Sequence, residues 1–150
     1  MTPAKTITVI GAGSWGTALA IQFARSGHRT LLWGRVEDHL DRLDEDRENQ
    51  QFLPGAAFPD SLEVQSDLGQ ALKESQVILV AVPSHAFRAV LEMLKPHLPD
   101  GARLAWATKG FELKTGKLPH QVAEEVLGHD IPKAVLSGPT FAKEVGAGLP

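Results

Sequence analysis

Short apolar runs alternate with amphipathic stretches along the chain. The apolar runs predict strands at residues 6–10, 29–33, 62–65, 77–82, 103–108 and 133–137. Apolar positions at helical spacing predict helices between them, at residues 14–26, 36–49, 67–75, 118–127 and from Ser84 onward. This alternation is typical of an α/β protein with a mostly parallel sheet and helical crossover connections.

The clearest pattern lies in the middle of the chain. Residues 77–82 form an unbroken apolar run, which is expected of a central strand covered on both faces. Pro83 ends this run, and Ser84 is expected to cap the helix that follows. Residues 52–59 contain two prolines and a glycine and predict an irregular loop. The buried face of the helix after Ser84 is expected to consist of Phe87, Val90, Leu91 and Leu94.

A glycine-rich motif joins the first predicted strand to the first predicted helix. Gly11, Gly13 and Gly16 have the spacing G-x-G-x-x-G. The first glycine permits a tight turn, the second lets the backbone approach a pyrophosphate, and the third lets the helix pack on the strand. A glycine-rich turn in an unrelated α/β protein is the alternative. Because strand and helix are both in register, the motif predicts a dinucleotide site on a Rossmann-type, doubly wound sheet with helices on both faces.

Composition narrows the class of protein. A chain of 150 residues is long enough for one well-packed domain, so residues 1–150 are expected to form a single dinucleotide-binding domain. The net charge of −3 gives no reason to expect nucleic acid as a partner. The chain has no cysteine, and its six histidines lack metal-binding spacing, so no metal site is expected. No apolar run reaches the ~18 residues of a membrane span. The default expectation is a cytoplasmic protein without membrane insertion.

The end of the second predicted strand bears on the choice of cofactor. Enzymes that prefer NAD usually have an acidic residue there, which binds the ribose 2′-hydroxyl. This chain has Gly34 and Arg35 instead. A guanidinium matches a 2′-phosphate in charge and geometry, so Arg35 favours NADP(H), while the nearby Glu37 and Asp38 keep NAD(H) open. The alternative for Arg35 is a solvated surface charge.

Later strand ends carry further candidates for ligand binding. Lys109 follows the strand at residues 103–108 and offers a positive charge to a phosphate, a carboxylate or a carbonyl oxygen. Gly138 and Thr140 follow the last predicted strand and are suited to bind a small anion. Simpler explanations are a surface lysine and a pair of residues that turns and caps the chain. His85, beside the end of the central strand, is interpreted as structural.

Several sequence blocks together resemble the bacterial NAD(P)-dependent glycerol-3-phosphate dehydrogenases. The blocks are, in order, residues 11–20 (GAGSWGTALA), 82–84 (VPS), 106–110 (WATKG) and 136–144 (LSGPTFAKE). The resemblance implies the reversible reduction of dihydroxyacetone phosphate to sn-glycerol 3-phosphate, which feeds phospholipid synthesis. It further implies that Lys109 is catalytic and touches both cofactor and substrate. Other implied contacts are Ser14, Trp15, Arg35 and Ala142 with NADPH, and Gly138 and Thr140 with the substrate.

The resemblance covers the nucleotide-binding part of that family. The resemblance implies that a proton-donating lysine and most of the phosphate site lie in a C-terminal helical domain. This domain is expected to be absent from these 150 residues, because the chain stops at residues 146–150 as if cut. Loss of a general acid typically costs ~10²–10⁴-fold in rate, so these 150 residues are expected to bind cofactor but to turn over slowly or not at all. Apolar surface that such a domain would otherwise cover is then expected to be exposed, which would favour self-association into a homo-oligomer.

Two other functions stay open from the sequence. One is a free-standing dinucleotide-binding or sensing module without chemistry of its own. The other is a related dehydrogenase acting on a 3-hydroxy acid or a sugar acid, against which the blocks at residues 106–110 and 136–144 argue. A reading frame that continues past Pro150 would favour the enzyme fragment, and a stop codon there would favour the module.

Overall fold

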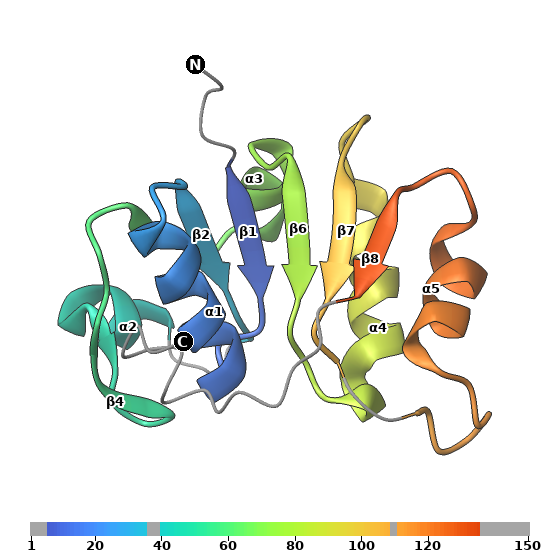
Figure 1. Ribbon diagram of the computed structural model, residues 1–150, viewed down its shortest axis with the longest axis horizontal. Helices are drawn as coiled ribbons and strands as arrows, with labels where there is room; N and C mark the ends of the chain where they lie inside the picture. Colours follow the sequence, from blue (N-terminus) through green and yellow to red (C-terminus); the bar gives the residue numbers. More distant parts are fainter. Residues whose placement is uncertain (1–5, 36–39, 109–110, 136–150) are drawn as a thin grey trace.

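A parallel sheet forms the centre of the protein (Figure 1). The computed structural model describes residues 6–35, 40–108 and 111–135. The strands of the sheet are β1 (Ile7–Ile10), β2 (Thr30–Trp33), β5 (Leu62–Val64), β6 (Val77–Val80), β7 (Arg103–Trp106) and β8 (Lys133–Val135). They follow the order β5-β2-β1-β6-β7-β8, and every neighbouring pair is parallel. This order confirms the predicted doubly wound, Rossmann-type sheet.

Helices cover both faces of the sheet. They are α1 (Ser14–Arg25), α2 (Leu40–Asp46), α3 (Leu68–Lys73), α4 (Ser84–Leu94) and α5 (Pro119–Leu127), with a short 3₁₀ turn, η2 (Lys95–His97). Figure 1 shows the helices on the two sides of the sheet. In β1, Val9 belongs to the apolar core with α1 and α2, whereas Ile10 belongs to the core with α3, α4 and α5. Successive side chains of this strand therefore pack into the two apolar cores on opposite faces of the sheet. None of the helices in the described part of the chain is long and apolar enough to cross a membrane.

The predicted buried face of α4 is confirmed. Its residues Phe87, Val90, Leu91 and Leu94 are each at most 2% exposed. The Phe87 ring also packs edge-on against Trp106 of β7, with ring centroids 5.8 Å apart. This contact fixes α4 over the ends of β6 and β7, where the sequence places its candidate site.

The predicted caps have different outcomes. Asp67 caps α3 as expected, because its carboxylate accepts a hydrogen bond from the backbone N–H of Gln70 (3.1 Å). The cap predicted at Ser84 is wrong: the N-cap of α4 is Pro83, with φ −62° and ψ 156°, and Ser84 is the first helical residue. Proline suits this place since its φ is fixed near that value and an N-cap N–H has no helical partner to lose.

The connection between β2 and β5 departs from the prediction. The helix expected at residues 36–49 is α2, which ends at Asp46, while residues 36–39 lie outside the described residues. Arg47 has a φ of 53°, a conformation that no right-handed helix continues. The chain then enters a two-stranded antiparallel ribbon made of β3 (Glu48–Asn49) and β4 (Leu53–Ala57).

The irregular loop predicted at residues 52–59 is therefore wrong in its central part. Leu53 and Ala56 are buried, whereas Pro54 and Gly55 are exposed. In a two-stranded ribbon each strand is an edge, so a proline without an N–H is tolerated. Gly55 has a φ of +87° and its N–H donates to the Glu48 carboxylate (3.1 Å), which stabilises the irregular pairing.

Candidate functional site

The order of the strands defines a crevice at the carboxyl edge of the sheet. The chain builds outward from β1 to β2 on one side and from β6 to β7 on the other, so β1 and β6 lie at the point where the order reverses. Ligands of open α/β sheets bind at this point. β6 ends at Val80 and β7 at Trp106, each two residues before its predicted end. The residues that follow both strands are thereby released from the sheet and can line the crevice.

Three adjoining cavities follow this edge. The first, of about 620 Å³, lies at the end of β2 and includes residues 33–35. The second, of about 200 Å³, joins residues 33–35 to residues 11–13 and 81–83. The third, of about 630 Å³, extends from residues 13–16 to residues 107–108. Because neighbouring cavities share lining residues, they form one elongated depression that suits an extended ligand such as a dinucleotide.

The glycine-rich turn has two glycines that the fold itself requires. Gly11 has a φ of +120°, and a Cβ placed on it would lie 2.3 Å from the carbonyl oxygen of Ala81. A Cβ on Gly16 would lie 1.9 Å from the carbonyl oxygen of Gly11. The tight turn and the close packing of helix on strand, both inferred from the motif, are therefore present in the structure.

Gly13 is different, because packing within the described chain does not require it. A Cβ on Gly13 would have no described atom within 4 Å, and its φ of −78° is open to any residue. The space in front of Gly13 belongs to the second and third cavities. Such space next to a backbone is what a pyrophosphate needs for close approach, so these residues fit the group.

The N-terminus of α1 adds the electrostatic part of this fit. Gly13 is the N-cap, and no side chain of the described residues caps the helix there. The first helical N–H groups have no partner within a helix, and they lie at the positive end of the helix dipole. No acidic residue occurs in the first turn of α1. The turn therefore offers unshielded donors to an anion.

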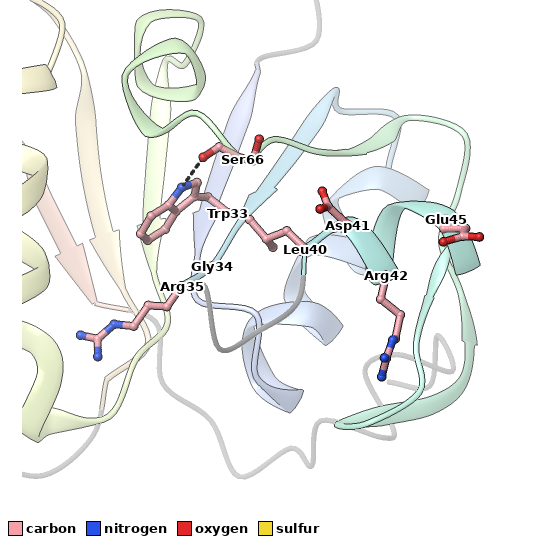
Figure 2. Close-up of a pocket in the computed structure, with 8 residues that line it drawn as sticks. All are labelled: Trp33, Gly34, Arg35, Leu40, Asp41, Arg42, Glu45 and Ser66. Carbon is pink, nitrogen blue, oxygen red and sulfur yellow. Dashed lines mark hydrogen bonds between the residues drawn. The ribbon is translucent and has the colours of Figure 1, made fainter.

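At the end of β2, the first cavity contains charges of both signs. Arg35 and Arg42 line it together with the carboxylates of Asp41 and Glu45. Figure 2 shows the Arg35 side chain directed away from Asp41 and Glu45. The indole Nε1 of Trp33 donates to the carbonyl oxygen of Ser66 (3.2 Å), which fixes the ring beside this cavity (Figure 2). Glu37 and Asp38, which kept NAD open in the sequence, lie outside the described residues.

The ends of β6 and β7 are tied together at the far side of the depression. The Thr108 hydroxyl donates to the carbonyl oxygen of Val82 (2.7 Å), and Thr108 is 5% exposed. His85 lines the second cavity from the first turn of α4 and is exposed.

The structure thus brings together Gly11, Gly13, Ser14, Trp15, Gly16 and Arg35 along one edge of the sheet. The predicted residues Lys109, Gly138, Thr140 and Ala142 lie outside the described residues and stay predictions.

Two residues beside the glycine-rich turn were not found from the sequence. Asn49 is 1% exposed and donates from Nδ2 to the carbonyl oxygen of Ala12 and to the Thr17 hydroxyl, both at 2.9 Å. Phe52 is 42% exposed and lines the third cavity. The only sequence feature that marks Asn49 is that it is the single asparagine of the chain. It lies within the helix predicted at residues 36–49, where polar residues are common, so its buried role could not be predicted.

An ion-pair network holds the segment that follows residues 109–110. The Arg88 guanidinium of α4 donates from Nε and Nη2 to the two carboxylate oxygens of Glu112, at 2.8 and 3.1 Å. Arg88 also donates to Glu125 of α5 (3.1 Å), and the Thr115 hydroxyl donates to Glu112 (2.6 Å). Hydrogen bonds from Arg88 and then Thr115 lower the pKa of Glu112 to about 2.

We expect the substitution Glu112→Gln to make the free energy of unfolding less dependent on pH in the acid range. A carboxylate whose pKa is lowered in the folded chain stabilises the fold above its ordinary pKa of 4.5, and this stabilisation is lost as the pH falls toward about 2. Glutamine takes up no proton in this window. Urea unfolding midpoints from about pH 5 to about pH 2.5 should therefore fall less in the variant than in the unaltered chain.

The matched control is Glu92→Gln, which changes an exposed carboxylate on the same helix as Arg88. Its acid dependence should follow that of the unaltered chain. If the Glu112→Gln curve also runs parallel to the unaltered one, the pair with Arg88 does not stabilise the fold.

Comparison with known proteins identifies relatives over nearly the whole chain. A family model described as the N-terminus of NAD-dependent glycerol-3-phosphate dehydrogenase matches residues 6–150. The glycerol-3-phosphate dehydrogenase [NAD(P)+] of Yersinia pestis (strain Pestoides F) is 60% identical over 144 residues, 96% of this chain and 42% of that protein. The chain thus spans less than half the length of the curated relatives it matches.

Solved structures show the same similarity. Glycerol-3-phosphate dehydrogenase from Coxiella burnetii is 41% identical, with a TM-score of 0.91 over 98% of this chain and 45% of that one. The enzyme from Saccharomyces cerevisiae is 27% identical, with a TM-score of 0.80 over 97% of this chain and 45% of that one. A Dunaliella salina protein at 21% identity and TM-score 0.84 shares the fold.

Proposed function

Because this chain belongs to the NAD-dependent glycerol-3-phosphate dehydrogenase family, matching its N-terminal part, we propose that it binds the cofactor of an oxidoreductase that interconverts dihydroxyacetone phosphate and sn-glycerol 3-phosphate. The observation that carries the proposal is the turn at Gly13, where open space, uncapped helix donors and the elongated depression meet. Since the chain spans 42% of the relatives' length, the complete reaction is proposed for a full-length protein of this family.

The depression suggests an order for the parts of the cofactor. We place the adenosine end beside β2, where Arg35 would hold a 2′-phosphate, and this favours NADPH over NADH. The pyrophosphate would lie on Gly13 and on the backbone donors of Ser14 and Trp15, which line the third cavity. The nicotinamide would then extend toward the ends of β6 and β7.

The substrate end rests on the sequence blocks and on the fold beside them. When bound, NADPH supplies a hydride to the ketone carbon of the substrate. Lys109 is proposed as the catalytic cation that stabilises negative charge on the ketone oxygen, touching cofactor and substrate. Gly138 and Thr140 are proposed to bind the substrate, and Ala142 the cofactor. The hydrogen bond from Thr108 to Val82 supports the placement of Lys109, because it fixes the preceding residue at the far side of the depression, in the lining of the third cavity.

Further parts of the proposal rest on the family. Membership favours the dehydrogenase over a sensing module and over a dehydrogenase for another class of acid. A role in phospholipid synthesis and a cytoplasmic location stay predictions. So does self-association, which is supported by the exposed side chains of Phe111 (53%) and Leu113 (84%).

A fluorescence titration of this chain with NADPH and with NADH tests the proposal. We expect saturable binding of both, with NADPH the tighter. Arg35→Gln should weaken NADPH about 10-fold or more, since hydrogen bonds to charged groups contribute about 1.5–3 kcal/mol, and should leave NADH nearly unchanged. The matched control is Arg42→Gln, which removes the other guanidinium lining the first cavity and should affect NADPH less.

Each outcome decides one part of the proposal. Failure of the chain to bind either dinucleotide would contradict the cofactor role. An equal loss of NADPH and NADH in Arg35→Gln would contradict the assigned 2′-phosphate contact. In a second arm, dihydroxyacetone phosphate is added to the NADPH-loaded chain. Oxidation of NADPH at least about 100-fold slower than in a full-length relative is expected, because the chain spans 42% of the relatives' length and the resemblance implies a general acid outside this span.

A further inference from the structure

Asn49 occupies a position that the function described so far does not use. It is the only asparagine of the chain, is 1% exposed, and lies at the end of β3. Its Nδ2 donates to the carbonyl oxygen of Ala12 and to the Thr17 hydroxyl, and its Oδ1 accepts from the backbone N–H of Phe52 (3.2 Å). Both of its N–H groups and its carbonyl oxygen are thus engaged. A buried amide with this many partners has one orientation.

The bond to Ala12 acts on the peptide group that precedes Gly13. The carbonyl of Ala12 and the N–H of Gly13 belong to one planar peptide unit, and in a trans peptide they point in opposite directions. Holding the carbonyl oxygen therefore also fixes the direction of the N–H, on the side away from Asn49. Gly13 is the residue with open space in front of it, at the N-cap of α1.

The other two bonds of Asn49 reach the surroundings of the same turn. Thr17 is the residue whose N–H closes the first turn of α1, donating to the carbonyl oxygen of Gly13 (3.0 Å). Phe52 lines the third cavity together with Gly13 and Ser14 of the glycine-rich turn. One buried side chain therefore connects the turn, the start of the helix and the aromatic wall of the cavity.

We propose that Asn49 is a positioning residue for the pyrophosphate of the bound dinucleotide: it orients the Ala12–Gly13 peptide so that the Gly13 N–H faces the anion. This inference rests on the proposed function, since it requires that a dinucleotide binds at this turn. Asn49 does not touch the ligand. It acts through the backbone of Ala12, by a hydrogen bond between residues 37 positions apart in the sequence.

The alternative role for Asn49 is to hold the ribbon of β3 and β4 against α1 without affecting the ligand. The two roles differ in what happens to ligands with and without a pyrophosphate. Adenosine 2′-monophosphate carries the adenosine and 2′-phosphate of NADPH but lacks the pyrophosphate. A loss confined to NADPH identifies positioning of the pyrophosphate, whereas a general loosening of the site weakens both ligands.

The experiment compares affinities of the two ligands in Asn49→Ala and in the more space-filling Asn49→Leu. NADPH affinity should fall about 10-fold or more, and that of adenosine 2′-monophosphate should change by less than about twofold. The matched control is Thr17→Val, which removes one acceptor of Asn49 but keeps its bond to Ala12, so NADPH affinity should stay within about twofold. Equal losses for both ligands, an unchanged NADPH affinity, or an equal NADPH loss in Thr17→Val would overturn the proposal.

A measurement on the unaltered chain covers the case in which the Asn49 variants do not fold. Because the chain has one asparagine, asparagine labelled with ¹⁵N in its side-chain amide gives the signal of Asn49 alone. NADPH should shift this signal, and adenosine 2′-monophosphate should leave it in place. No shift at saturation with NADPH would overturn the role of Asn49 while leaving the proposed function intact. Absence of NADPH binding would overturn the proposed function and this role with it.

Discussion

Replacing Gly13 by alanine is expected to leave the protein folded and to weaken NADPH binding roughly 10- to 100-fold. The added methyl group would push the pyrophosphate away from the backbone donors of the turn. Hydrogen bonds to a charged group contribute about 1.5–3 kcal/mol, which corresponds to a loss of this size. The fold should tolerate the change. No described atom lies within 4 Å of the new Cβ, and the φ of −78° suits alanine. The cost to stability is that of a poorer N-cap, about 1 kcal/mol or less.

Two measurements on the same sample separate these effects. Urea unfolding should give nearly the stability of the unaltered chain, while fluorescence titration should show the loss of affinity. Gly55→Ala, in the exposed part of β4, also has open space for a Cβ and is the control for glycine replacement outside the site. It should cost some stability, because its φ is +87°, but leave NADPH affinity unchanged. Full NADPH affinity in Gly13→Ala would show that no anion approaches this backbone.

Replacing Gly16 by alanine is expected to have the opposite result, a loss of the fold itself. The Cβ would lie 1.9 Å from the carbonyl oxygen of Gly11, a backbone atom that a rotamer change cannot move. Overpacking of this kind typically costs about 1–3 kcal/mol and occasionally more, and here the helix must separate from the turn to relieve the contact. Because the contact is with a backbone atom, the cost here is expected to exceed that range and to approach a typical stability of about 5–15 kcal/mol, which leaves a marginal or unfolded protein.

The measurement is urea unfolding followed by circular dichroism, compared with Gly69→Ala in α3. A Cβ on Gly69 would lie 3.3 Å from the His97 ring, which is a movable side chain, so this helical glycine should accept alanine with little change or a gain in stability. If Gly16→Ala is as stable as the unaltered chain, the close packing of α1 on the turn is not a requirement of the fold.

The contrast between these glycines shows which features of the turn can be predicted from the sequence alone. The spacing G-x-G-x-x-G assigned a turn to Gly11 and a helix contact to Gly16, and the geometry agrees for both. The ligand approach that it assigned to Gly13 stays a prediction, which the open space there supports. The sequence also determined the positions of the six strands of the central sheet, their mostly parallel arrangement and the buried face of α4. These features follow from local properties: side-chain periodicity within one element, and positions where the backbone must be free of a Cβ. The roles of Lys109, Gly138, Thr140 and Ala142 stay predictions from the resemblance.

Only the tertiary structure decided what surrounds the glycine-rich turn. The ribbon of β3 and β4 was missed because a proline and a glycine argue against a strand, yet both are acceptable in an exposed two-stranded edge. Asn49 was missed because its partners, Ala12 and Thr17, are 37 and 32 positions away along the chain. Local sequence sets backbone preferences and which side of an element is buried. Which buried donor meets which acceptor depends on how distant segments pack, and no local pattern contains that information.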